Sequence, residues 1–187
     1  MRDCWYHFVD TETSSLSPFA KNYKGEILEL AIYSVHGKTG EEVDRVWRVK
    51  PEHIETAHPR SLEVNGYTEE GWSKAVPFFL IREEVAEILS EGVLVGHSLA
   101  FDLRFIRFEL QRAGWDGKLS HLHICTRQMV VEHTDFEKTS LDYCRSVLPL
   151  TAPGRAHSAL KDAKDCAALF FLLASEEGLS ADSDSDS

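Results

Sequence analysis

The chain has 187 residues, 43% of them hydrophobic and 27% charged, which is typical of one folded domain and excludes a chain that is disordered throughout. Its formal net charge of −11 argues against a broad basic face for nucleic acids, but five acidic residues lie beyond Ser175, and carboxylates that hold cations make their own site positive. The four cysteines form no C-x-x-C pair, and no stretch approaches the roughly 18 apolar residues of a membrane span, so we expect a cytoplasmic protein with reduced thiols and no membrane contact.

Three consecutive antiparallel strands are predicted at the start of the chain. Residues 5–10 and 27–35 are aromatic and apolar runs with little alternation, as expected of strands covered on both faces. Residues 43–49 alternate instead, so the odd-numbered side chains share one face of a strand, and residues 37–40 have the composition of a turn before it.

Helical patterns dominate after Pro51. Residues 78–90 and 99–113 carry apolar side chains at helical spacing, and residues 93–95 form a short buried strand between them. The turn GHS after that strand lies at its carboxyl end, where open α/β sheets bind ligands. Further elements are expected as a strand at 122–125 and helices at 126–132, 140–147 and 157–174.

Hydrophobic residues almost vanish after Ser175, and the final DSDSDS has nothing to bury. We therefore expect a catalytic domain at residues 1–175 and an acidic disordered tail at 176–187.

Four acidic residues lie at the ends of the predicted elements. Each alone is typical of a turn or a helix terminus, but together they would repel one another by about 4 kcal/mol per pair at about 4 Å and an effective dielectric near 20. Such a cluster needs cations, and Mg²⁺ or Mn²⁺ suits hard oxygen ligands, with two ions about 3.5 to 4 Å apart in phosphodiester cleavage. The four are Asp10 and Glu12 in DTET, Asp102 in HSLAFD and Asp162 in HSALKDA, five residues after His157.

These three motifs, in this order, resemble the DEDDh branch of the DnaQ-like 3′→5′ exonucleases over roughly residues 4–175. The segments ILELAIYSV and SLDYCRSV lie where that family has its second strand and a later helix. The resemblance implies an α/β, ribonuclease H-like fold, in which a mixed sheet of three antiparallel strands followed by parallel strands is flanked by helices.

The resemblance also implies the role of each motif residue. Asp10, Glu12 and Asp162 would surround the first ion and the attacking water, and Asp10 would also reach a second ion together with Asp102. His157 would be the general base, since an imidazole with a pKa near 6.5 accepts a proton near neutral pH.

Substrate contacts follow from the same resemblance. Thr13 and Leu16 match positions that meet the terminal nucleotide, and His97 and Asn65 match positions that line the same pocket. The chain departs from the family in having Ser14 and Ser15 where Gly is common, Ser98 where Asn is common, and Asn65 where His is frequent, which leaves substrate preference open. Arginines on the exposed side of the 99–113 helix are candidates for phosphate contacts: Arg104, Arg107 and Arg112.

The leading hypothesis is a metal-dependent exonuclease that releases nucleoside 5′-monophosphates from the 3′ ends of single-stranded or frayed DNA. Alternatives within the nucleases are a proofreading subunit bound to a polymerase and an enzyme that trims RNA or degrades oligoribonucleotides. A binding module without activity is the alternative of another class, but its signature would be the loss of a carboxylate or of the histidine, and all five are present. A homodimer is expected by family analogy alone.

Overall fold

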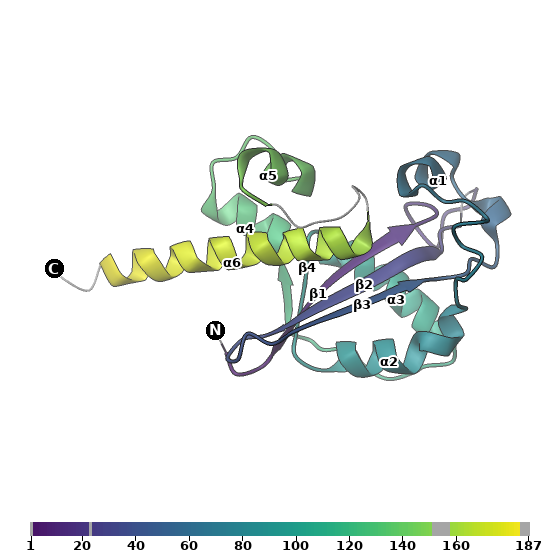
Figure 1. Cartoon of the computed structure of the whole chain (residues 1–187), viewed down its shortest axis with the longest axis horizontal. Helices are drawn as coiled ribbons and strands as arrows, with labels where there is room; N and C mark the ends of the chain where they lie inside the picture. Colours follow the sequence, from purple (N-terminus) through teal and green to yellow (C-terminus); the bar gives the residue numbers. More distant parts are fainter. Residues whose placement is uncertain (1, 23, 151–157, 184–187) are drawn as a thin grey trace.

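The computed structural model describes residues 2–22, 24–150 and 158–183. In this part of the chain the strands form one five-stranded sheet in the order β3-β2-β1-β4-β5 (Figure 1). β1 (Trp5–Thr13), β2 (Ile27–His36) and β3 (Glu42–Arg48) are antiparallel, and β4 (Val93–Gly96) and β5 (His123–Cys125) run parallel to β1. The expected mixed sheet, with antiparallel strands first and parallel strands after them, is confirmed.

β1 is longer than the apolar run that predicts it. We expected it to end at Asp10, but pairing with β2 continues through Asp10, opposite Ala31, and Glu12, opposite Glu29, up to an irregularity before Thr13. Main-chain hydrogen bonds need no apolar side chain, so the polar motif stays in the sheet as long as its neighbour is extended. The acidic motif therefore belongs to the strand itself.

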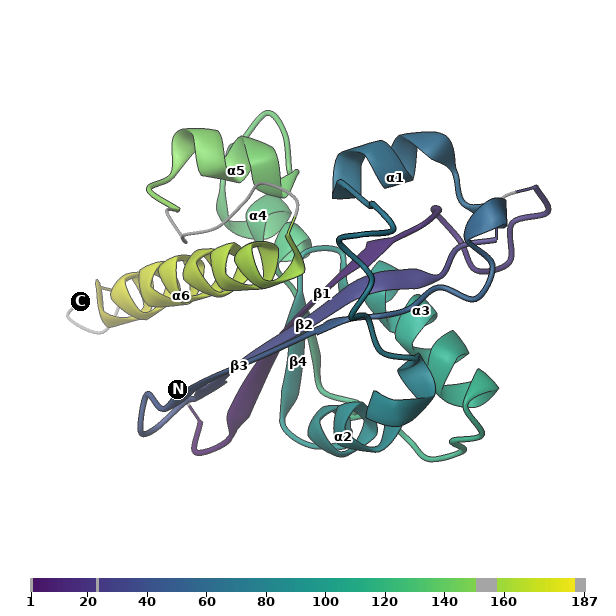
Figure 2. The ribbon, with the colours of Figure 1, turned by 45° about the vertical axis from the view of Figure 1, so that its right-hand side comes forward.

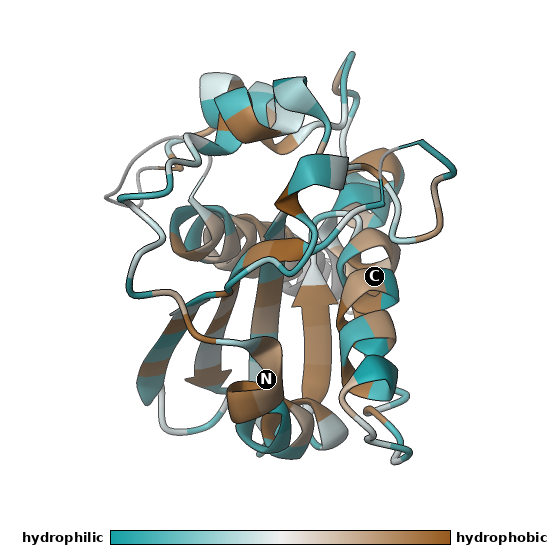
Figure 3. Ribbon diagram, turned by 90° about the vertical axis from the view of Figure 1, so that its right-hand side faces the viewer, coloured by the Kyte–Doolittle hydropathy of each residue, from teal (hydrophilic) through white to brown (hydrophobic). Residues whose placement is uncertain are grey.

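Helices cover both faces of the sheet (Figures 1 and 2). α2 (Phe78–Ser90) and α3 (Leu99–Arg112) pack on the face that includes Leu30 and Ile32 of β2, and α6 (Ala159–Ser183) packs on the opposite face. Since β2 is buried on both sides, its continuous apolar run is explained. The central strands are correspondingly hydrophobic along much of their length in Figure 3.

Smaller helices complete the two ends of the fold. α4 (Thr126–His133) and α5 (Leu141–Val147) share a third apolar cluster with α6. A short 3₁₀ turn, η1 (Ile54–Thr56), and α1 (Pro59–Asn65) follow β3, where the sequence indicates only a helical tendency. None of the helices among the described residues is long and apolar enough to cross a membrane.

α6 ends later than its apolar pattern predicts. We expected the helix to end at residue 174, but it continues to Ser183, into the segment assigned to a disordered tail. Propagating a helix that is already packed is far easier than starting one, so a polar extension stays helical without a core to cover. The boundary between a domain at 1–175 and a tail at 176–187 stays a prediction.

Candidate metal centre

Three of the four predicted acidic ligands converge at one point. Asp10 and Glu12 alternate with buried Thr11 on β1, so they share a face of the strand, and Asp162 comes from the first turn of α6. One ligand oxygen from each of the three lies within 4.8 Å of the other two. Three carboxylates at this spacing, all partly accessible, form a set of hard oxygen donors of the kind that Mg²⁺ and Mn²⁺ bind.

Asp102 lies beside this group rather than in it. It occupies the first turn of α3, where it is 4% exposed, and one of its oxygens accepts hydrogen bonds from the backbone N–H of Thr11 at 2.9 Å and from the Thr11 hydroxyl at 2.8 Å. Burial raises the pKa of Asp102 to about 7, and the two bonds from Thr11 oppose that rise. The Thr11 side chain lies on the face of β1 opposite to Asp10 and Glu12. The two hydrogen bonds from Thr11 hold the Asp102 carboxylate in place.

The electrostatics of Asp10 support a cation site. Burial raises the pKa of Asp10 well above its ordinary value, and the charges of Asp102, Asp162 and Glu12 raise it further, whereas Arg145 lowers it. A divalent cation would reverse this balance because it favours the ionised carboxylates. The donor set and its mutual repulsion thus fit a metal ion.

Arg145 is a member of the site that the sequence does not reveal. Its Nη2 lies 2.6 Å from Asp162 Oδ1, its Nε lies 2.6 Å from Asp165 Oδ2, and its Nη1 lies 2.7 Å from Asp142 Oδ1. Asp165 is fully buried and also pairs with Lys161, so the ion pair with Asp165 fixes the position of the Arg145 guanidinium. The arginine supplies a positive charge to the acidic cluster and orients Asp162. Its spacing to Asp142, three residues apart on a helix, is the only sequence signal, and it is equally typical of a surface ion pair.

These side chains surround a small open hollow of about 190 Å³. It is lined by Asp10, His97, Ser140, Leu141, Asp142, Arg145 and Asp162.

His97 lines the hollow but has both ring nitrogens occupied. Nε2 lies 2.7 Å from the carbonyl oxygen of Thr139, to which it must donate, so Nδ1 accepts from the Thr126 hydroxyl at 3.0 Å. The Thr126 hydroxyl also lies 3.3 Å from Cys166 Sγ. Burial lowers the pKa of His97, which favours this neutral tautomer. His97 therefore fixes the loop before α5 against α4 and α6.

Ser98 adopts the left-handed conformation, with φ of 78°, at the turn between β4 and α3. Asn and Gly adopt this conformation more readily than Ser, so the turn places some backbone strain at Ser98.

Thr13 and Asn65, two of the predicted substrate contacts, lie in hydrogen-bond contact with each other. The Asn65 side-chain amide donates to the carbonyl oxygen of Thr13 at 2.9 Å, and the Thr13 hydroxyl donates to the carbonyl oxygen of Ser15 at 2.8 Å. Leu16, three residues further on, is 78% exposed. A leucine that is not packed on the core is available for contact with another molecule.

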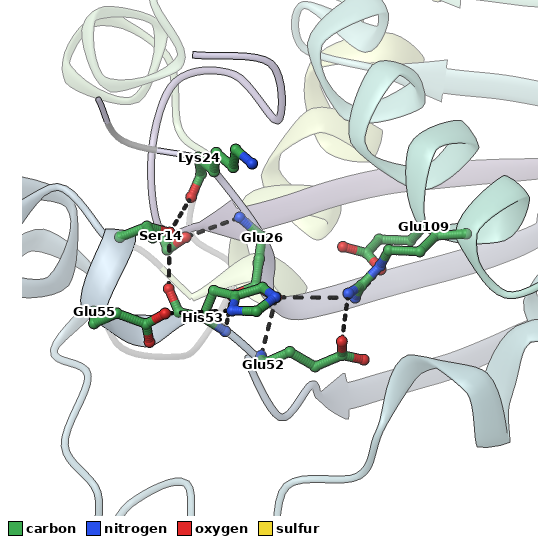
Figure 4. Close-up of polar contacts among 9 residues, drawn as sticks. Ser14, Lys24, Glu26, Glu52, His53, Glu55 and Glu109 are labelled. Atoms are coloured by element: carbon green, nitrogen blue, oxygen red, sulfur yellow. Dashed lines mark hydrogen bonds and ion pairs between the residues drawn. The ribbon is translucent and has the colours of Figure 1, made fainter. Parts of the chain in front are cut away.

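The serine that replaces Gly after the first motif has a structural role. Ser14 Oγ accepts from the backbone N–H of Glu26 at 2.8 Å (Figure 4). The Ser14 carbonyl accepts from the backbone N–H of His58 at 2.8 Å. The buried carboxylate of Glu26 in turn accepts from the backbone N–H groups of Glu52 and His53. Ser14 therefore anchors both ends of the β1–β2 loop to the segment before α1.

Arg112, one of the three candidate phosphate-binding arginines, is occupied by ion pairs to carboxylates of the same network. It lies 2.7 Å from carboxylate oxygens of Glu52 and Glu109 and 3.9 Å from Glu26. The three neighbouring glutamates compensate the positive charge of Arg112, so we do not expect it to bind a phosphate.

His157 lies outside the described residues. Directly after that segment, the backbone N–H of Ala159 donates to Glu29 Oε1 at 3.0 Å, so a carboxylate of β2 caps the start of α6. This contact fixes the helix that carries Asp162 to the sheet that carries Asp10 and Glu12.

The comparisons with known proteins agree with this geometry. The exonuclease family RNase_T matches residues 8–170. The chain is 27% identical over 169 residues to a DNA polymerase III PolC-type protein of Thermotoga maritima, and 23% identical over 173 residues to one of Staphylococcus epidermidis. These matches cover 90% and 92% of this chain but 12% of each relative, so the chain spans a small part of the length of these relatives.

Solved structures with the same fold are nucleases. The nuclease domain of 3′hExo, a DEDDh family member bound to rAMP, has a TM-score of 0.75 at 18% identity and 92% coverage of both chains. Exonuclease X in complex with 5′ overhanging duplex DNA has a TM-score of 0.67 at 22% identity, with coverage of 92% of this chain and 93% of the other. Cell-death related nuclease 4 has a TM-score of 0.74 at 17% identity, with 92% and 64% coverage.

Proposed function

Because the chain belongs to the RNase_T exonuclease family and is a DEDDh exonuclease by fold and motifs, we propose an exonuclease activity on DNA. The proposed enzyme removes nucleoside 5′-monophosphates from the 3′ ends of single-stranded or frayed DNA. The observation that carries the proposal is the convergence of Asp10, Glu12 and Asp162 within 4.8 Å. Carboxylates in this arrangement would hold cations that stabilise the negative charge on phosphate oxygens during hydrolysis.

Two divalent cations, Mg²⁺ or Mn²⁺, are the proposed cofactors. Asp10, Glu12 and Asp162 would hold one ion, and Asp10 with Asp102 would hold the second, directly or through water. When bound, the ions supply the positive charge that activates water and stabilises both the attacking and the leaving oxygens. Thr11 keeps Asp102 in place through its two hydrogen bonds, and Arg145 orients Asp162.

His157 is the proposed general base. It precedes α6, whose first turn carries Asp162, so the base and the ligand come from one short segment of the chain. A neutral imidazole would take one proton from the attacking water as the water oxygen bonds to phosphorus and the bond from phosphorus to the 3′ oxygen breaks. The leaving 3′ oxygen would take a proton from solvent, and the imidazolium would return its proton to solvent. Thr13, Leu16, Asn65 and His97 are proposed to form the pocket of the terminal nucleotide, with His97 acting through the loop it fixes.

DNA is the first candidate substrate because the curated relatives are named as DNA polymerases, and RNA is the second because the 3′hExo nuclease domain is described as bound to rAMP. The PolC-type relatives suggest a polymerase as the partner, since this chain matches 12% of their length. The pocket departures at Ser14 and Asn65 do not favour either sugar.

The test uses matched DNA and RNA oligonucleotides of one sequence, single-stranded and double-stranded, labelled at either end. Digestion from the 3′ end converts a 5′ label into a descending ladder and releases a 3′ label as a mononucleotide in the first turnover. Glu12→Gln protein, prepared in parallel, controls for contaminating nucleases and should be inactive. A 5′ label released first, or digestion that proceeds equally in excess chelator, would contradict the proposal.

A further inference from the structure

The loop between β1 and β2, which follows the acidic motif of β1, exposes two large apolar side chains. Leu16 is 78% exposed and Phe19 is 68% exposed, and both follow within seven residues of Glu12. The backbone N–H of Gly25 donates to the carbonyl oxygen of Ser17 at 2.9 Å, so the two sides of the loop are joined on either side of Phe19. A large aromatic side chain that stays mostly in solvent is typical of a site that binds another molecule.

Phe19 extends from the loop to Phe108 of α3. Its ring meets the ring of Phe108 edge to face, with centroids 5.2 Å apart and an interplanar angle of 86°. One turn earlier on the same helix, the Arg104 guanidinium lies 5.4 Å from the centroid of Phe101 and donates weakly to the Leu16 carbonyl at 3.4 Å. Aromatic rings and an exposed cation therefore lie together along α3 and the β1–β2 loop.

We propose that Phe19, Phe108 and Arg104 form a binding surface for single-stranded nucleic acid, on which the bases and phosphates on the 5′ side of the terminal nucleotide rest. This inference rests on the proposed function and deepens it, because it names the residues that would bind the part of the nucleic-acid substrate outside the active site.

The chemistry of the surface favours a nucleic acid over a protein partner. Aromatic rings that stack on bases and arginines that pair with phosphates are the two components of sequence-tolerant binding to single strands, and stacking contributes about 1 to 3 kcal/mol per base. Arg104 makes no ion pair among the described contacts, whereas Arg112, on the same helix, is surrounded by Glu26, Glu52 and Glu109. On a chain of net charge −11, a cation left uncompensated beside exposed aromatic rings is complementary to a polyanion.

The chain offers a matched control for Phe19. Phe79 at the start of α2 is 54% exposed and has the Arg82 guanidinium 3.8 Å from its ring centroid, so it has the same chemistry. It lines a different hollow together with Glu52 and Glu109, whose negative charges disfavour phosphates.

The experiment compares a dinucleotide with an octanucleotide, both single-stranded and 5′-labelled, in wild type, Phe19→Ala, Phe19→Trp and Phe79→Ala. Phe19→Ala should lower kcat/KM for the octanucleotide about tenfold, through KM, and leave the dinucleotide unchanged within about twofold. Phe19→Trp should retain the wild-type preference for the longer strand, and Phe79→Ala should behave as wild type. All four proteins should melt within about 2 °C of one another.

A binding measurement separates charge from stacking. Fluorescence anisotropy of a labelled octanucleotide, titrated with each protein across a range of salt concentrations, should show a slope of log K against log salt that is shallower by about 0.7 in Arg104→Gln and unchanged in Phe19→Ala.

Two outcomes overturn the inference: equal kcat/KM of wild type and Phe19→Ala on the octanucleotide, or an equal loss on both substrates. If wild type itself digests neither oligonucleotide with Mn²⁺, the proposed function fails instead, and the two failures are therefore distinguishable.

Discussion

Replacing Asp10 by Asn is expected to stabilise the protein when metal is removed. An Asp10 oxygen lies within 4.8 Å of oxygens of Glu12 and Asp162, and at that distance and an effective dielectric near 20 each pair of charges repels by about 3.5 kcal/mol. The attraction of Arg145 and partial protonation offset much of this, so we expect a net gain of about 2 kcal/mol. For a domain of this size the melting temperature then rises by about 4 to 8 °C.

The gain should depend on pH with a definite sign. The pKa of Asp10 is raised in the folded state above its ordinary value of 3.8, so ionising it costs folding free energy. That cost is absent below the unfolded pKa and grows as the pH rises toward and through the folded pKa. Asp10→Asn should therefore differ little from wild type near pH 4 and most at pH 8.

Thermal unfolding in excess chelator, followed by circular dichroism at pH 5 and pH 8, measures both effects. Asp116→Asn, which removes an exposed carboxylate from the α3–β5 loop, is the control and should shift the melting temperature by less than about 1 °C. Saturating Mn²⁺ should reverse the order, because wild type gains a bound ion and the variant gains less. If Asp10→Asn in chelator melts at or below the wild-type temperature at pH 8, the three acids are not in mutual repulsion and the electrostatic reasoning is wrong.

Three further changes probe single contacts. Arg145→Gln should lower the free energy of unfolding by about 3 kcal/mol in urea titrations, because buried Asp165 loses its ion pair with the guanidinium, and an unchanged midpoint would contradict the stabilising role of that ion pair. Thr11→Val removes one hydrogen bond to the Asp102 carboxylate and should cost about 1.5 to 3 kcal/mol at pH 8, whereas Thr11→Ser should restore most of it. His157→Ala should lower kcat by roughly 10² to 10⁴ with Mn²⁺ affinity unchanged, and a variant that keeps more than about a third of wild-type turnover would exclude the general-base role.

Hydrophobic periodicity predicts most of the fold because the core is made of regular faces. The helix Phe78–Ser90 has the predicted bounds, and the alternation in β3 places Val43, Arg45 and Trp47 on its half-buried face. The end of β1 was predicted too early, because the pairing of a polar strand is decided by its neighbour β2 and not by its own composition.

The acidic cluster could be expected from the sequence because its motifs are local, whereas the contacts around the cluster could not. Arg145 contacts Asp162 and Asp165 from another helix, and Ser14 contacts Glu26 across a loop. Contacts between residues on different elements produce no periodic pattern in the sequence, so they could not be predicted from it. The role of His157 stays a prediction.

The central claim is that Asp10, Glu12 and Asp162 bind divalent cations, and calorimetric titration of Mn²⁺ into chelator-stripped protein tests it most directly. Wild type should bind two ions per chain, and Glu12→Gln should lose the tighter site while keeping its fold by circular dichroism. Equal Mn²⁺ binding by both proteins, or no binding by wild type, would contradict the assignment of this cluster as the metal centre.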